Sequence, residues 1–137
     1  MIWLHIPGFT SSAGGPRWGD CALLRNKFSG KLYDVLIDIY TAQGQKIAIN
    51  RLKELGVKEP YIYISHAHGD HDEFIDLIND SYFAPRGLFC YDPDTLTSGL
   101  SNGEVKGDYN YLKKVIKAAK AKGIPVKYLK DGDKCVH

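Results

Sequence analysis

The sequence predicts an α/β domain in which helices cover a mixed sheet, and three observations support this fold class. Two apolar stretches rich in β-branched and aromatic residues, 32–40 and 61–64, are typical of buried strands. Apolar residues at helical spacing follow each of these stretches. Strand and helix patterns therefore alternate along the chain, as they do in layered α/β domains.

Weaker strand patterns lie at 2–6, 21–25, 88–91 and 126–129. The apolar residues of 32–40 and 61–64 are continuous rather than alternating, which predicts strands buried on both faces. We expect three strands before the first helix, and three more strands that alternate with helices.

Two helices are predicted from apolar stripes, and each ends before a glycine, Gly56 or Gly123, at the position that favours glycine. Asp108 is the expected N-cap of the second helix. A short helix is expected over 72–78, and 9–19 and 92–107 are expected to be loops. The stripe residues are Ile47, Ile49, Leu52 and Leu55 in the first helix, and Leu112, Val115, Ile116 and Ala119 in the second.

The composition indicates one globular domain over residues 1–137. Hydrophobic residues make up 44% and charged residues 25%, which excludes a disordered chain. Basic and acidic residues nearly balance, with a net charge of +2, so the composition does not predict a nucleic-acid-binding surface. Three dispersed cysteines, Cys21, Cys90 and Cys135, are typical of reduced thiols rather than disulfides. With no signal peptide and no membrane-length apolar run, we expect a cytoplasmic protein without a membrane partner.

One short loop carries the candidate chemistry. Three of the five histidines lie within six residues, together with Asp70. The loop follows the apolar stretch 61–64 and precedes a predicted helix, which places it at the carboxyl end of a strand, where ligand sites of α/β proteins collect. The candidate metal ligands are His66, His68, Asp70 and His71.

The spacing of these residues suits metal binding. His66 and His68 project to the same side of an extended segment and would bind one ion, whereas Asp70 and His71 would reach a second ion beside it. Nitrogen and carboxylate ligands favour Zn²⁺, with Mn²⁺ or Fe as alternatives. A catalytic zinc keeps one position for water, whose pKa falls to about 7. The alternative, solvated or capping histidines, is disfavoured by their clustering.

The run from His66 to His71 resembles the signature loop of the metallo-β-lactamase superfamily. Asp38, at the end of the stretch 32–40, is similar to the strand-ending aspartate of that family, which would orient the metal loop as a supporting residue. Asp20 follows Gly19, as in the Gly-Asp strand of the branch related to the hydrolase domain of DNA-uptake competence proteins. The segment 122–126 and the turn 131–133 also follow the order of that branch.

This resemblance implies the N-terminal half of an αββα sandwich and a metal-dependent hydrolase with two zinc sites. Asp70 would be the catalytic residue, because it would also orient the nucleophile. The substrate would be an ester in a small molecule or a nucleic acid, with a phosphodiester favoured by the competence-like features.

The resemblance also implies that a second half supplies further ligands. After His71 the chain has one histidine, His137, which we interpret as a strand residue rather than a ligand. We therefore expect a truncated domain that is inactive alone. Its uncovered sheet would favour a homodimer or a partner chain. The alternatives are a non-catalytic binding or assembly module that keeps the loop, and one half of a split enzyme.

Overall fold

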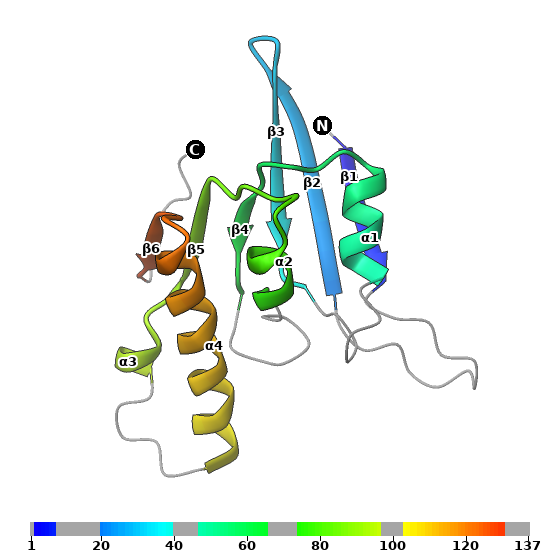
Figure 1. Ribbon diagram of the computed structural model, residues 1–137. Helices are drawn as coiled ribbons and strands as arrows, with labels where there is room; N and C mark the ends of the chain where they lie inside the picture. Colours follow the sequence, from blue (N-terminus) through cyan, green and yellow to red (C-terminus); the bar gives the residue numbers. More distant parts are fainter. Residues whose placement is uncertain (1, 8–19, 40–46, 66–73, 97–102, 131–137) are drawn as a thin grey trace, which may run out of the picture.

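A computed structural model describes residues 2–7, 20–39, 47–65, 74–96 and 103–130. Six strands form one sheet in the order β1-β2-β3-β4-β5-β6 (Figure 1). The strands are β1 Ile2–Pro7, β2 Asp20–Phe28, β3 Lys31–Ile37, β4 Tyr61–Tyr63, β5 Gly87–Tyr91 and β6 Val126–Leu129. The helices are α1 Ile47–Glu54, α2 Ile75–Asn79, α3 Pro93–Leu96 and α4 Gly103–Ala121.

The sheet is mixed, as the sequence predicts. β1, β2 and β3 are antiparallel neighbours, whereas β3, β4, β5 and β6 run parallel. β4, β5 and β6 are each reached through at least one helix, the usual connection between parallel strands. The parallel strands therefore all begin at one edge of the sheet, the amino-terminal edge, and all end at the opposite carboxyl-terminal edge (Figure 1).

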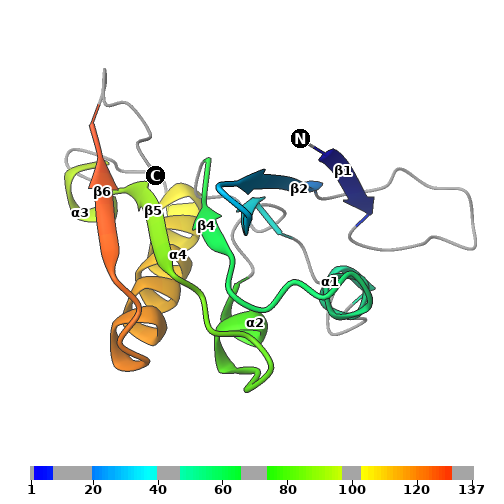
Figure 2. The same ribbon diagram turned by 90° about the horizontal axis from the view of Figure 1, so that it is seen from above.

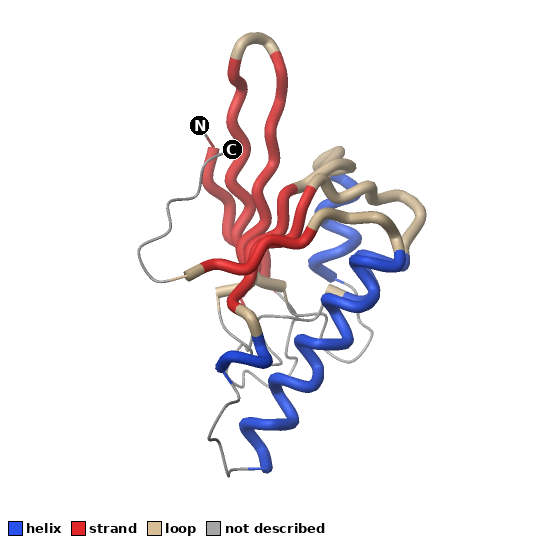
Figure 3. Tube along the Cα trace, turned by 90° about the vertical axis from the view of Figure 1, so that its left-hand side faces the viewer, coloured by secondary structure: helices blue, strands red, loops and turns tan. Residues whose placement is uncertain are grey.

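Helices α1, α2 and α4 lie against the same face of the sheet (Figures 2 and 3). One row of side chains in register across the strands provides the apolar surface beneath them: Leu23, Leu36, Ile62 and Leu88, each at most 3% exposed. The predicted stripes of α1 and α4 supply the opposing layer, including Ile49, Leu52, Leu112 and Val115. No helix in the described part of the chain is long and apolar enough to cross a membrane.

The other face of the sheet is aromatic and half-buried. Tyr61, Tyr63 and Phe89 occupy it, and the rings of Tyr63 and Phe89 stack with their centroids 4.6 Å apart. No helix among the described residues lies against this face (Figure 3). The expectation of burial on both faces is therefore wrong for β4. Aromatic residues make the sequence of a strand continuously hydrophobic even when their rings lie on a half-buried face and stack on one another.

The hairpin of β2 and β3 is longer than expected and projects beyond the helices (Figure 1). Its turn is formed by Ser29 and Gly30, whose φ angles are 50° and 78°, the positive values that a two-residue hairpin turn requires. The expected strand over 32–40 is therefore shifted: it begins at Lys31 in the exposed hairpin and ends at Ile37.

Several helix boundaries differ from the expectation. α4 begins at Gly103, so Asp108 lies inside the helix and is not its N-cap, and α3 occupies part of the expected loop over 92–107. α2 begins at Ile75, after Phe74, rather than at residue 72. The glycine stops are confirmed: Gly56 and Gly123 have φ angles of 75° and 76° after the last turns of α1 and α4. Local capping patterns fix where a helix ends more reliably than where it begins in this chain.

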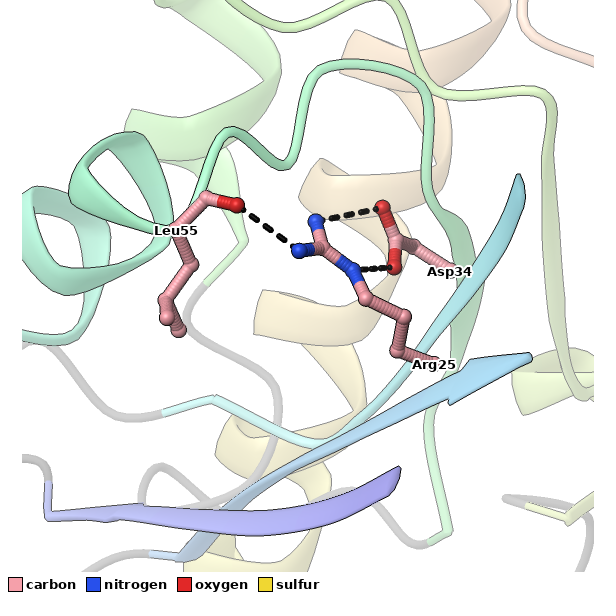
Figure 4. A network of polar contacts seen from close by, with 3 residues as sticks. All are labelled: Arg25, Asp34 and Leu55. Carbon is pink, nitrogen blue, oxygen red and sulfur yellow. Dashed lines mark hydrogen bonds and ion pairs between the residues drawn. The ribbon is translucent and has the colours of Figure 1, made fainter. Parts of the chain in front are cut away.

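A polar network fastens α1 to the sheet (Figure 4). The Arg25 guanidinium donates from Nε to Asp34 Oδ1 at 2.7 Å and from Nη2 to Oδ2 at 3.1 Å. Its Nη1 donates to the carbonyl oxygen of Leu55 at 2.9 Å, so the carbonyls at the end of α1 gain a partner. The hydrogen bond to Asp34 and its charge raise the pKa of Arg25, although partial burial opposes this shift.

Candidate metal centre

The candidate site lies at the carboxyl-terminal edge, where β3 and β4 end side by side. Asp38 directly follows β3, and Ile64 and Ser65 follow β4 and lead into the loop that begins with His66. Since β3 and β4 are parallel neighbours with Ile37 opposite Tyr63, the residues after both strands are adjacent. The fold therefore brings the predicted supporting aspartate to the start of the predicted metal loop.

Hydrogen bonds connect Asp38 to Ser65 directly. The Ser65 backbone N–H donates to Asp38 Oδ1 at 2.7 Å, and the Ser65 hydroxyl donates to Oδ2 at 2.5 Å. The Asp38 backbone N–H donates in turn to the carbonyl oxygen of Tyr63 at 2.9 Å. Both carboxylate oxygens of Asp38 thus hold the residue that precedes His66.

The position of Asp38 depends on an unusual backbone conformation. Its φ angle is 61°, in the left-handed region, and its side chain is almost fully buried, since the residue is 5% exposed. Such a conformation costs on the order of 1 kcal/mol in a non-glycine residue, although aspartate tolerates it better than most. The hydrogen bonds to Ser65 and Tyr63 offset this cost and keep the carboxylate beside the end of β4.

The stem of the loop is also fixed from its other side. The Ile64 backbone N–H donates to the carbonyl oxygen of Phe89 at 3.0 Å, which continues the β4–β5 pairing past the end of β4. Ile64 is 2% exposed and belongs to the core. The last residues before His66 are therefore held by both neighbouring strands, as suits a metal loop mounted on a rigid element.

The two cysteines of the described chain are not candidate ligands. Burial, with a further contribution from the charge of Asp38, raises the pKa of Cys21 to about 12. Burial also raises the pKa of Cys90 to about 12. Both thiols stay protonated at neutral pH, whereas metal binding and nucleophilic attack need the thiolate. Cys21 and Cys90 are both buried and free of disulfides, as expected for reduced thiols.

The predicted ligands themselves, His66, His68, Asp70 and His71, lie outside the described residues. For Asp20 the structure gives the backbone, which opens β2 at the carboxyl-terminal edge opposite Pro7. Within the described ranges, no group of three or more His, Cys, Asp or Glu residues is arranged to hold a metal ion. The ligand set stays a prediction from the sequence, and the structure supplies the element that positions it.

Sequence reasoning assigned no role to Ser65. The signal was present, because a hydroxyl side chain stands immediately before the first histidine of the loop. Its partner, however, is 27 positions away in the chain, and only the parallel pairing of β3 with β4 brings the two residues into contact. The contact gives the aspartate at the end of β3 a structural role at the start of the loop.

Comparison with known proteins supports the fold. No protein-family model and no curated protein matches the sequence. Among the solved structures, this chain is similar to a crystal structure described as a "putative metallo-beta-lactamase" from Thermotoga maritima. The similar region covers 97% of this chain, with a TM-score of 0.54 and 17% sequence identity. The chain spans 58% of the length of that protein. At this identity the likeness shows the fold, an α/β fold similar to that structure.

Proposed function

We propose that this chain carries the N-terminal part of the active site of a metal-dependent hydrolase of the metallo-β-lactamase type. The observation that carries the proposal is the double hydrogen bond from Ser65 to Asp38, directly before the His66 loop. The fold is similar to that of a protein described as a "putative metallo-beta-lactamase", and the contact supports the proposal that Asp38 orients the loop.

The donor set suits two zinc ions. His66 and His68 would serve one ion, and Asp70 and His71 the second, with Mn²⁺ or Fe as alternatives. When bound, zinc supplies Lewis acidity and lowers the pKa of a coordinated water. The chain's own part is positional: Asp38 holds the entrance of the loop through Ser65, and Asp70 would also orient the nucleophile.

The number of ligands argues that other residues complete this site. Catalytic zinc usually takes three protein ligands, so two ions need about six, and the loop offers four. We propose that residues outside the loop, in further sequence or in a partner chain, supply the remainder. The 137-residue chain alone is then expected to bind metal weakly and to be inactive.

For the substrate we propose a phosphodiester in nucleic acid, with esters of small molecules as the alternative. This choice depends on the likeness of Gly19, Asp20 and the segment 122–126 to the competence-protein branch. We also propose a cytoplasmic location, from the reduced cysteines. The fold alone does not identify the substrate, because one fold can support many different reactions.

Zinc binding by matched variants tests the proposal. Equilibrium dialysis followed by elemental analysis would compare the wild-type chain with His66→Ala/His68→Ala and with the control His5→Ala/His137→Ala. Both variants lose two histidines, but only the first alters the loop. Loss of bound zinc in the loop variant alone supports the assignment. The comparison is made at a zinc concentration at which the wild-type chain binds, and equal binding by the two variants there would show that the loop is not the metal site.

An assembly role is the second candidate, and the open face of the sheet favours it. Tyr61, Tyr63 and Phe89 are half-buried on a face that no described helix covers. A homodimer or a partner chain would bury this surface. Light scattering during size exclusion measures the assembly directly, and a strictly monomeric chain with normal zinc binding would exclude the homodimer.

A further inference from the structure

The amino-terminal edge, opposite the candidate metal site, gathers basic side chains that are dispersed in the sequence. The hairpin 25–34 projects beyond this edge, and three more segments lie along the edge: the end of α1 with 51–60, the segment 79–87, and the end of α4 with 117–127 (Figures 1 and 3). Backbone hydrogen bonds join the last three, from Ala84 to Lys58, from Arg86 to Pro60 and from Leu88 to Pro125. These four segments hold eleven of the 18 Lys and Arg residues but four of the 16 Asp and Glu residues.

Each of the four acidic residues at this edge already has a basic partner. Asp34 pairs with Arg25 at 2.7 Å, Glu54 with Arg51 at 3.0 Å, Asp80 with Lys53 at 2.6 Å and Glu59 with Arg86 at 3.0 Å. The positive excess therefore falls on exposed lysines that have no carboxylate partner among the described residues. They are Lys27, Lys31, Lys58, Lys117, Lys120, Lys122 and Lys127.

Three of these lysines lie over tyrosine rings instead. The ammonium of Lys31 is 5.7 Å from the centroid of Tyr33, that of Lys58 is 5.5 Å from Tyr82, and that of Lys120 is 5.6 Å from Tyr128. The three rings are half-buried. At the tip of the hairpin, between Lys27 and Lys31, Phe28 is 68% exposed. The edge thus combines cations with an exposed aromatic ring, Phe28, and with half-buried tyrosine rings beneath the cations.

We infer that this edge binds single-stranded nucleic acid. Lysines along a groove or edge bind the phosphate backbone, and aromatic side chains stack on unpaired bases. The excess of positive charge fits a polyanion, and the exposed ring of Phe28 fits an unpaired base that is free to stack. The inference does not depend on the proposed hydrolase function, because none of the residues that carry it belongs to the candidate metal centre.

The overall charge conceals this surface. The net charge of +2 is the sum of a basic amino-terminal edge and an acidic remainder of the chain. The acidic remainder includes Asp70, Asp72 and Glu73 beside the histidines. In the sequence, 16 residues or more separate each basic segment from the next, and the parallel strands align them at one edge. Long-range fields of this kind guide a charged partner to one side of a protein.

Fluorescence anisotropy with a labelled 20-nucleotide single strand tests the inference. The measurement is made in EDTA, so that a failure of the metal site cannot affect it. The variant Lys58→Ala/Lys120→Ala is compared with the control Lys106→Ala/Lys130→Ala, which removes the same charge from the first turn of α4 and the end of β6. We expect the first variant to bind about tenfold more weakly at low salt, with a salt slope smaller by about 1.4, which corresponds to two phosphate contacts. The control should stay within about twofold of wild type.

The variant Phe28→Ala separates stacking from charge. It should bind about tenfold more weakly, the value of about one stacked base, with an unchanged salt slope. An unchanged affinity in Phe28→Ala would overturn the assignment to single strands. Equal binding by the two lysine variants, or no binding by the wild-type chain, would overturn the inference as a whole. So would vesicles of anionic phospholipid that compete as well as unlabelled oligonucleotide, because the surface would then recognise lipid.

Discussion

The carboxylate of Asp38 accepts one hydrogen bond from the backbone and one from the hydroxyl of Ser65, across the parallel strands β3 and β4. This contact links a buried residue in the left-handed conformation to the first position before the histidine loop. Orienting contacts of this kind around a metal site commonly change metal affinity by 10- to 100-fold.

The first prediction concerns this contact. Asp38→Asn keeps one acceptor oxygen but replaces the other with an N–H donor, so the bond from the Ser65 hydroxyl to a charged acceptor is replaced at best by a neutral bond in the reverse direction. We expect the free energy of unfolding to fall by about 2 kcal/mol, because hydrogen bonds to charged groups contribute about this much. Zinc affinity should fall by about tenfold or more. Urea unfolding and zinc titration measure the two effects.

The control for Asp38 is Asp76→Asn in the first turn of α2, which is exposed. It removes the same charge and should change stability by less than about 1 kcal/mol. If Asp38→Asn were as stable as Asp76→Asn, the contact with Ser65 would have no structural role.

The second prediction concerns the pair of Arg25 and Asp34. Arg25→Met leaves the Asp34 carboxylate, 9% exposed, without its partner and also removes the hydrogen bond to Leu55. We expect a loss of about 3 kcal/mol, the usual effect of breaking a buried pair from one side. The control Arg51→Met breaks the exposed pair with Glu54 and should cost less than about 1 kcal/mol. Similar losses of unfolding free energy in both variants would show that the buried pair contributes no more to stability than the exposed pair.

The third prediction concerns the turn of the β2–β3 hairpin. Gly30 has a φ angle of 78°, and a Cβ there would meet nothing within 4 Å. Gly30→Ala should therefore destabilise by about 1 kcal/mol through backbone conformation alone. Ser29→Asn should instead stabilise by a few tenths of a kcal/mol (~0.5), because asparagine favours positive φ angles in such turns. Thermal unfolding of both variants checks the opposite signs.

The fourth prediction concerns alkaline pH. Burial raises the pKa of Cys21 from 9.0 to about 12, so the folded state keeps a proton that the unfolded chain loses. The thiol therefore contributes its full stability below pH 9, and this contribution declines between pH 9 and about 12, by at most about 1.4 kcal/mol for each pH unit. Urea unfolding of Cys21→Ala at pH 8 and pH 10 should show a shallower decline than the wild-type chain. An identical pH dependence would contradict the raised pKa.

The sequence determined much of this architecture through local chemistry. The order of strands and helices follows from hydrophobic periodicity, and the ends of α1 and α4 follow from Gly56 and Gly123, which adopt the left-handed conformation. The starts of helices were less predictable. Asp108 looks like an N-cap, but α4 begins at Gly103, directly after Asn102, whose residue type suits the N-cap position equally well.

The candidate site divides in the same way. Residue type and spacing predict the histidine loop as the candidate metal-binding segment and Asp38 as its supporting residue. Metal ligands and carboxylates at the ends of strands have recognisable local patterns. The contact between Asp38 and Ser65, the pair of Arg25 and Asp34, and the basic edge formed by distant lysines depend on strand pairing over tens of residues. Local patterns carry no information on such pairing, so the sequence by itself determined which residues have the chemistry. Only the tertiary structure decided which of them meet.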